Sequence, residues 1–212
     1  GSAMRQTFES TSSTLLEQLG ADDHGAWQQL DVRYRAIIVA SGERHGLNCA
    51  DAADAAQETL VSVYEAYRAG KYDRSRGRLC HWVMGIARNR IVDVQRARAR
   101  TNRAHRNGMN EMPRPDSIDP ADFEPIWREA MREHIFRRAL EELRERSHAE
   151  RRTLEAFERY VIAQRPAAEV AASLGMTVNN VHLAKHRCVK AMREIVREIE
   201  LEVSLIHISE PT

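Results

Sequence analysis

The sequence predicts an all-α protein in which two helical domains are joined by a flexible linker. Apolar residues recur every three to four positions along nearly the whole chain, as on the buried stripe of an amphipathic helix. Aromatic residues make up only 6% of the chain, which argues against a β-sheet domain. A Pro-rich segment at residues 107–126 divides the helical pattern in two. With 212 residues, 42% of them hydrophobic, the chain can build one or two cores.

Three helices are expected ahead of the Pro-rich segment. The first has Asp23 as its candidate N-cap, and its apolar stripe comprises Trp27, Leu30, Tyr34, Ile37 and Ile38. The second runs from about residue 51 to residue 67, and its expected buried stripe comprises Ala53, Ala56, Leu60, Val63, Tyr64 and Tyr67. Gly70 interrupts the pattern, a basic loop covers residues 71–78, and a third helix is expected over about residues 79–98.

The segment at residues 107–126 is the best candidate for a linker. Proline lacks a backbone N–H and clashes with the preceding helical turn, so a segment this rich in proline is not expected to be helical. Its prolines are Pro113, Pro115, Pro120 and Pro125. The expected domains are therefore residues 14–106 and 127–202. Residues 1–13 resemble a tag remnant and a disordered start, and residues 203–212 resemble a non-native tail.

The second domain contains the pattern of a helix-turn-helix. One helix is expected over residues 127–146, and another from a capping box at residues 147–150 to about residue 163. Pro166 suits the first turn of the next helix, and Gly175 permits the left-handed turn that ends it. Thr177 can cap a final helix that reaches about residue 202.

The final helix has two unlike faces. The predicted buried face comprises Val181, Ala184, Cys188, Met192 and Ile195. The opposite face and its flanks carry Asn, His, Lys and Arg, and no acidic residue occurs between Met176 and Arg193. Such a face can bond base edges and phosphates, so DNA binding is favoured over the solvated face of an ordinary helical hairpin. His182 and His186 have metal-ligand spacing, but no nearby Cys or acid pattern completes a site, so neither a metal nor a cofactor is predicted.

Residues 71–106 form the most basic part of the chain. Eleven Lys and Arg are opposed there by two Asp, a balance of about +9 that favours a polyanionic partner. Trp82, Asn89 and Arg96 recur every seven residues on one helix face, a combination that suits unpaired bases. Burial of Trp82 in the core is an equally supported alternative.

The helix before this stretch carries an acidic face with Asp54, Gln57, Glu58 and Glu65. From charge alone, an ordinary solvated helix face is favoured over a docking surface for a basic protein. Cys49, Cys80 and Cys188 are scattered, as in reduced cytoplasmic proteins. No apolar stretch approaches the ~18–20 residues of a membrane span, so no membrane insertion is expected.

Two blocks resemble sigma factors of bacterial RNA polymerase, in particular the small extracytoplasmic-function (ECF) group. Residues 51–64, DAADAAQETLVSVY, resemble the Asp-x-x-x-Gln-Glu signature of that family. Residues 76–93, RGRLCHWVMGIARNRIVD, resemble its Trp-(x)3-Ile-Ala-Arg-Asn block. The helix-turn-helix falls where the fourth region of the family lies. The resemblance covers residues 14–100 and 127–200, which it identifies as sigma region 2 and sigma region 4.

The resemblance implies a role for each functional surface. The residues implied to dock on the clamp helices of the largest polymerase subunit are Asp54, Gln57 and Glu58. Those implied to hold the melted −10 element are Lys71, Arg74, Arg76, Arg78, Trp82, Arg88, Asn89 and Arg96. Those implied to read the −35 duplex are Thr177, Asn179, Asn180, His182, Lys185, His186, Arg187 and Lys190. The linker would run toward the RNA exit path, and helices near residues 150–163 would contact the flap of the second-largest subunit.

The implied function is promoter recognition and strand opening for core RNA polymerase, in the cytoplasm at the nucleoid. No nucleophile–base pair, phosphate-binding glycine loop or metal cluster is evident, so the chain is not expected to be an enzyme. Members of the family are often held inactive by an anti-sigma factor. One alternative is an autonomous helix-turn-helix regulator that acts as a dimer. A second is an RNA-binding protein that uses residues 71–106.

Overall fold

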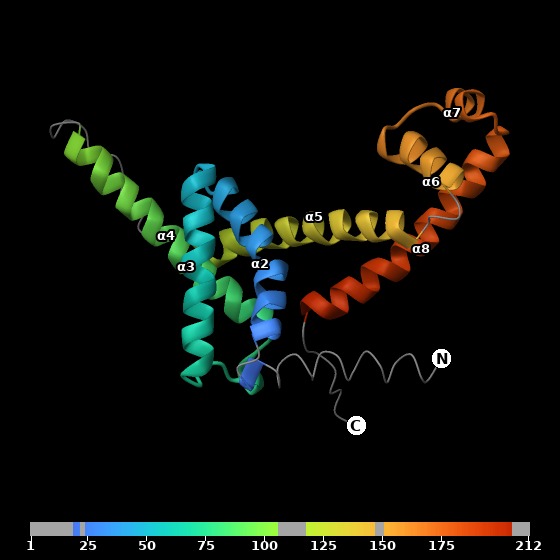
Figure 1. Cartoon of the computed structure of the whole chain (residues 1–212). Coiled ribbons are helices and arrows are strands. Elements are labelled where there is room, and N and C mark those ends of the chain that lie inside the picture. The colour runs from blue at the N-terminus through green and yellow to red at the C-terminus, as the bar shows by residue number, and fades with distance from the viewer. Residues whose placement is uncertain (1–18, 22–23, 106–117, 147–150, 205–212) are drawn as a thin grey trace. The chain divides into compact units, whose positions relative to one another are not determined.

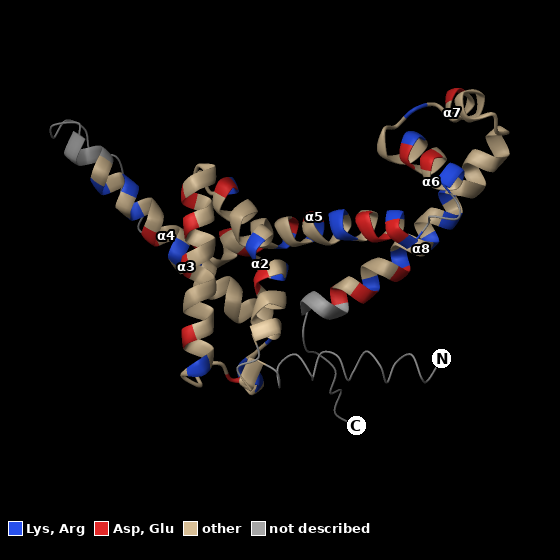
Figure 2. Ribbon diagram, viewed as in Figure 1, with Lys and Arg blue, Asp and Glu red and all other residues tan. Residues whose placement is uncertain are grey.

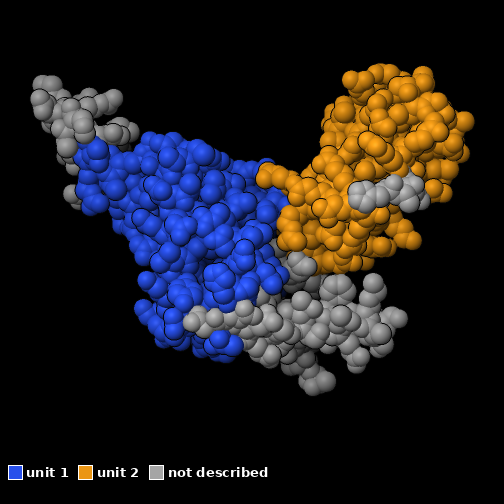
Figure 3. Space-filling view, in the orientation of Figure 1, with its two compact units in different colours: residues 1–134, 201–212 blue, residues 135–200 orange. Residues whose placement is uncertain are grey.

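The computed structural model describes residues 19–21, 24–105, 118–146 and 151–204. Every element with assigned secondary structure in these ranges is helical, which confirms the predicted all-α fold class (Figure 1). The chain divides into two compact units (Figure 3): residues 1–134 with 201–212, and residues 135–200. The Asp23 cap, the capping box at residues 147–150, residues 106–117 of the linker and both chain ends lie outside the described residues.

The first unit is built on three helices, α2 (His24–Arg44), α3 (Cys49–Arg68) and α4 (Leu79–His105). Helix α3 packs against both α2 and α4. The core is formed by side chains that are almost entirely buried, including Leu30, Tyr34, Ile37, Ile38, Val63, Leu79, Val83, Ala87 and Ile91. Complete burial disfavours the phenolate form and raises the pKa of Tyr34.

The buried stripe of α3 differs from the prediction, in which Tyr64 and Tyr67 were also buried: both are half-buried. Ala53 is exposed, whereas Ala52, Ala55 and Thr59 are buried alongside the predicted Ala56, Leu60 and Val63. Because α3 is covered by helices on two sides, its buried face is wider than a single stripe. The close crossing also explains the small residues: a Cβ on Gly42 of α2 would lie 3.4 Å from the Cβ of Ala52.

Helix α5 (Pro120–Arg146) begins inside the segment predicted to be a linker. The expectation that residues 120–126 are not helical is therefore wrong. The Asp119 side chain accepts a hydrogen bond from the Ala121 N–H at 2.8 Å, and Pro120 occupies the first helical position, where a missing N–H is not needed. This Asp-Pro start signal was present in the sequence.

Buried aromatic rings hold the first half of α5 in the first unit. Phe123 stacks on His45 with centroids 4.9 Å apart, and Trp127 stacks on Tyr34 at 6.4 Å. Phe123 and Trp127 are 1% and 3% exposed. Their burial offsets the hydrogen bond that Pro125 removes from the helix.

The second unit contains the rest of α5, then α6 (Arg151–Phe157), the π-helical turn η3 (Glu158–Ile162), α7 (Ala167–Leu174) and α8 (Val178–Ser204). Its small core joins α6, α7 and the start of α8, through Ala156, Val170, Ala171, Val181 and Ala184. Two predicted helix signals are confirmed. Gly175 is left-handed, with φ 59° and ψ 43°, and Thr177 Oγ1 accepts a hydrogen bond from the Asn180 N–H at 3.1 Å.

Candidate polymerase and nucleic-acid interfaces

The acidic face of α3 is exposed within the part of the chain that the structure describes. Asp54, Gln57 and Glu58 are all exposed, on the side of the helix opposite the buried alanines. Val61 follows on the same face, 44% exposed, with Glu65 one turn beyond it. The structure therefore brings the three predicted docking residues together and adds an apolar centre, which the helical spacing could have revealed.

The Gln57 side chain is held in place by Arg35 of α2. Arg35 Nη2 donates to Gln57 Oε1 at 2.8 Å, and the same guanidinium makes a bidentate pair with Asp31. The hydrogen bond to Asp31 raises the pKa of Arg35 and keeps it charged. Sequence reasoning missed this residue, although the i,i+4 spacing of Asp31 and Arg35 was readable.

The loop between α3 and α4 presents cations to solvent. Its geometry is set by Asp73, whose carboxylate accepts hydrogen bonds from the Ser75 N–H at 2.9 Å and Ser75 Oγ at 2.7 Å. These bonds lower the pKa of Asp73 and stabilise the short helix η1 (Arg74–Arg76). The four predicted cations are exposed: Lys71, Arg74, Arg76 and Arg78.

The sequence left open whether Trp82 faces unpaired bases or is buried in the core, and the structure shows an intermediate position. Its ring is half-buried and packs against Tyr72 at 5.1 Å and Tyr67 at 6.5 Å. Tyr67 extends this aromatic cluster to Trp27, at 5.5 Å. Burial raises the pKa of both Tyr67 and Tyr72. Trp82 is thus anchored at the edge of the core with part of its surface open.

The cations of α4 divide into two groups. Arg90 donates to Ser62 Oγ at 2.9 Å and Arg98 pairs with Asp51 at 2.9 Å, so these two hold α4 against α3. Asn89 and Arg96 are exposed, and Arg88 is half-buried with its Nη2 3.5 Å from Asn89 Oδ1. Figure 2 shows basic residues on the loop after α3 and along α4. Asn89 and Arg96, both predicted to bind the unpaired strand, are thus open to solvent.

Helix α8 has the two faces predicted for it. The whole predicted buried stripe, from Val181 to Ile195, is buried. The predicted reading residues are all exposed: Thr177, Asn179, Asn180, His182, Lys185, His186, Arg187 and Lys190. Their common exposure on one basic helix suits entry into a major groove.

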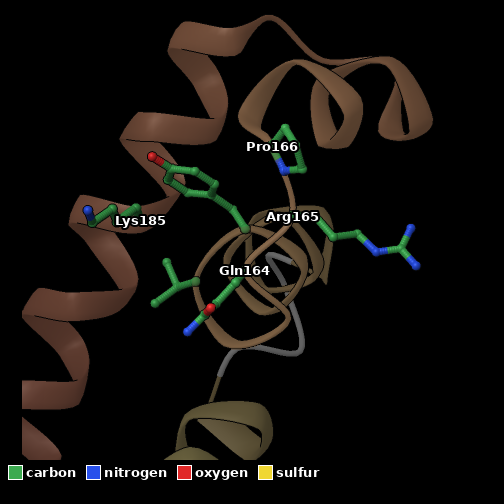
Figure 4. Close-up of a pocket in the computed structure, with 6 residues that line it drawn as sticks. Gln164, Arg165, Pro166 and Lys185 are labelled. Carbon is green, nitrogen blue, oxygen red and sulfur yellow. The ribbon is translucent and has the colours of Figure 1, made fainter.

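Tyr160 of η3 was missed by sequence reasoning and orients two of these residues. The His182 ring meets the Tyr160 ring edge-on at 5.4 Å, and Lys185 Nζ lies 5.7 Å from its centroid. Tyr160 and Lys185 also line an open pocket of about 450 Å³, together with Val161, Gln164, Arg165 and Pro166. Figure 4 shows these side chains. Only tertiary packing brings Tyr160 to α8, so no local sequence signal could reveal it.

Within the described ranges, no group of three or more His, Cys, Asp or Glu side chains could hold a metal ion. No described helix is both long and apolar enough to cross a bilayer.

One family model matches part of the first unit. Residues 33–101 match the family model described as Sigma-70 region 2. No curated protein matches the chain. The matched segment extends from α2 to α4 and includes the acidic face of α3, the basic loop and the exposed residues of α4. Residues 33–101 therefore resemble a sigma-70 region 2 domain, and this match supports membership of the chain in the sigma-70 family.

Proposed function

We propose that the chain is a sigma factor of the ECF group that binds core RNA polymerase, recognises a two-part promoter and opens the DNA. The observation that carries this proposal is the region 2 match over residues 33–101, followed in the chain by a helix-turn-helix with a basic, acid-free face. Residues 14–106 would be region 2 and residues 127–202 region 4, with the first half of α5 packed on region 2.

The acidic face of α3 would dock on the clamp helices of the largest polymerase subunit. Asp54 and Glu58 supply negative charge to a basic partner, and Gln57 offers an amide whose position Arg35 fixes. Val61 adds apolar contact at the centre of the surface. This arrangement supports the docking role over the solvated face that charge alone favoured.

Strand opening would follow from preferential binding of unpaired DNA. The exposed cations at residues 71–78 would hold the backbone around a base flipped from the −10 element. The open surface of Trp82, together with Arg88, Asn89 and Arg96, would lie along the non-template strand. Because binding energy is gained only when the strands separate, the equilibrium shifts toward the open promoter. Bond chemistry would be left to the polymerase.

Helix α8 would read the −35 element as duplex DNA. Asn179 and Asn180 stand at the start of the helix, where side chains reach base edges, and the cations further along suit phosphates. The linker would run toward the RNA exit path, and α6 with η3 would approach the flap of the second-largest subunit. An anti-sigma factor is the regulatory partner expected in the cytoplasm.

Charge reversal on α3 tests the docking step. We expect Glu58→Lys to weaken binding to core polymerase about tenfold, because it places a cation against a basic surface. Glu43→Lys is the matched control, since Glu43 is an exposed acid of α2 outside the acidic face. Binding would be measured by titrating labelled chain with core enzyme. Equal losses in the two variants would argue against docking through α3.

A further inference from the structure

Leu183 is an apolar residue on the reading face of α8. Its side chain is 46% exposed, although its neighbours Val181 and Ala184 belong to the buried stripe. At about 100° per residue, Leu183 points roughly opposite the centre of that stripe. Asn179 precedes it by one turn and His186 and Arg187 follow by one turn, so it lies among the predicted DNA-reading side chains.

The position of Leu183, rather than its exposure, calls for an explanation. Single exposed apolar residues are common on protein surfaces. Among the described residues, however, Val178 is the only other large apolar side chain of α8 that is strongly exposed, and it starts the helix near the buried side. Leu183 stands on a face that is otherwise amide, imidazole and cation. A partner that complements the whole of that face would offer one apolar group within a polar, anionic surface.

Duplex DNA offers such a group. The major groove presents hydrogen-bond donors and acceptors at every base pair, but its one apolar feature is the C5-methyl group of thymine. The same groove supplies phosphates for Lys185, Arg187 and Lys190, and adenine edges for the amides of Asn179 and Asn180. The partner chemistry that satisfies the whole face at once is a groove containing a thymine methyl group.

We propose that Leu183 contacts the methyl group of a thymine in the −35 element and makes that position specific for thymine. This inference rests on the proposed function, because it assumes that α8 reads duplex promoter DNA. It assigns a specificity role to a residue outside the polar reading set.

Replacing thymine with deoxyuridine tests the contact, because it removes only the methyl group. Each thymine of the −35 element, on either strand, would be replaced in turn in a promoter fragment, and binding by the complex of full chain and core polymerase measured by competition. We expect one replacement to weaken wild-type binding about fourfold, the value of one buried methyl group. Leu183→Ala should show a similar loss on the thymine promoter and no further loss on the deoxyuridine promoter.

Two further variants separate this contact from general effects. Phe136→Ala removes a side chain of similar exposure, 49%, from α5 in the same unit, and should bind like the wild type with the same sensitivity to deoxyuridine. Leu183→Met keeps an apolar side chain and should retain the sensitivity. Deoxyuridine outside the −35 element should have no effect in any variant.

The outcomes distinguish the contact from the proposed function. A −35 element without thymine, a wild type insensitive to every replacement, or a Leu183→Ala variant that stays sensitive would each overturn the contact while leaving the sigma role intact. Failure of the wild-type complex to bind any promoter would overturn the sigma role and the contact together.

Discussion

At the scale of single residues, Arg35 bridges two helices at the proposed docking surface. One guanidinium bonds Asp31 on its own helix and Gln57 on the next, so the amide of Gln57 is fixed before any partner arrives. Preorganised groups lose less side-chain entropy on binding, and so contribute more to affinity.

Removing this guanidinium should therefore affect binding more than stability. We expect Arg35→Ala to weaken core polymerase binding about fivefold, the value of one hydrogen bond. The free energy of unfolding should change by less than about 1 kcal/mol, because the pair with Asp31 is partly exposed. Arg68→Ala is the control, since Arg68 is an exposed cation of α3 that donates to the Tyr64 hydroxyl of its own helix at 3.0 Å. Unchanged affinity in Arg35→Ala would exclude a positioning role.

At the scale of elements, the turn between α7 and α8 depends on Gly175. The residue has φ 59°, a conformation that costs an L-residue roughly 1–2 kcal/mol. We expect Gly175→Ala to destabilise the helix-turn-helix by about 1 kcal/mol, seen as faster amide exchange in α7 and the start of α8. Gly85→Ala, in the interior of α4 with open space at its Cβ, should instead stabilise its helix by about 0.5–1 kcal/mol. Identical behaviour of the two variants would contradict this assignment.

Amide exchange can show which of the two units the first half of α5 packs with. Trp127 is 3% exposed and stacks on Tyr34, so Trp127→Ala should cost about 3–5 kcal/mol in the first unit. Amide exchange should rise in α2 and stay unchanged in α7 and α8. Phe136→Ala, at an exposed site of the same helix, should leave both units unchanged. Faster exchange confined to α7 and α8 would place Trp127 with the second unit, where its sequence position had suggested.

At the scale of the whole molecule, the sequence predicted the features that depend on residues close together in the chain. The two faces of α8, the Gly175 turn and the Thr177 cap follow from residues near one another in the chain, and each is confirmed. The features that were missed depend on packing between distant residues. Packing of α3 on both α2 and α4 buries the side that carries Ala52, Ala55 and Thr59 and leaves Ala53 exposed, and Tyr160 reaches His182 only after the unit has folded.

The charge distribution of the whole chain also agrees with the proposed role. A net charge of +1 combines an acidic face on α3 with cations on the loop at residues 71–78, on α4 and on the first half of α8 (Figure 2). Separate surfaces of opposite charge suit a molecule that joins a basic protein surface to DNA. The second alternative, an RNA-binding protein, leaves the acidic face and α8 without a role.

Transcription by core polymerase on fragmented DNA of the source bacterium, with and without the chain, tests the central claim most directly. The account predicts new, discrete start sites only when the chain is present, each preceded by a shared two-part motif. Tight dimeric binding of the chain to palindromic DNA, with no new start sites and no binding to core polymerase, would contradict it and favour an autonomous regulator.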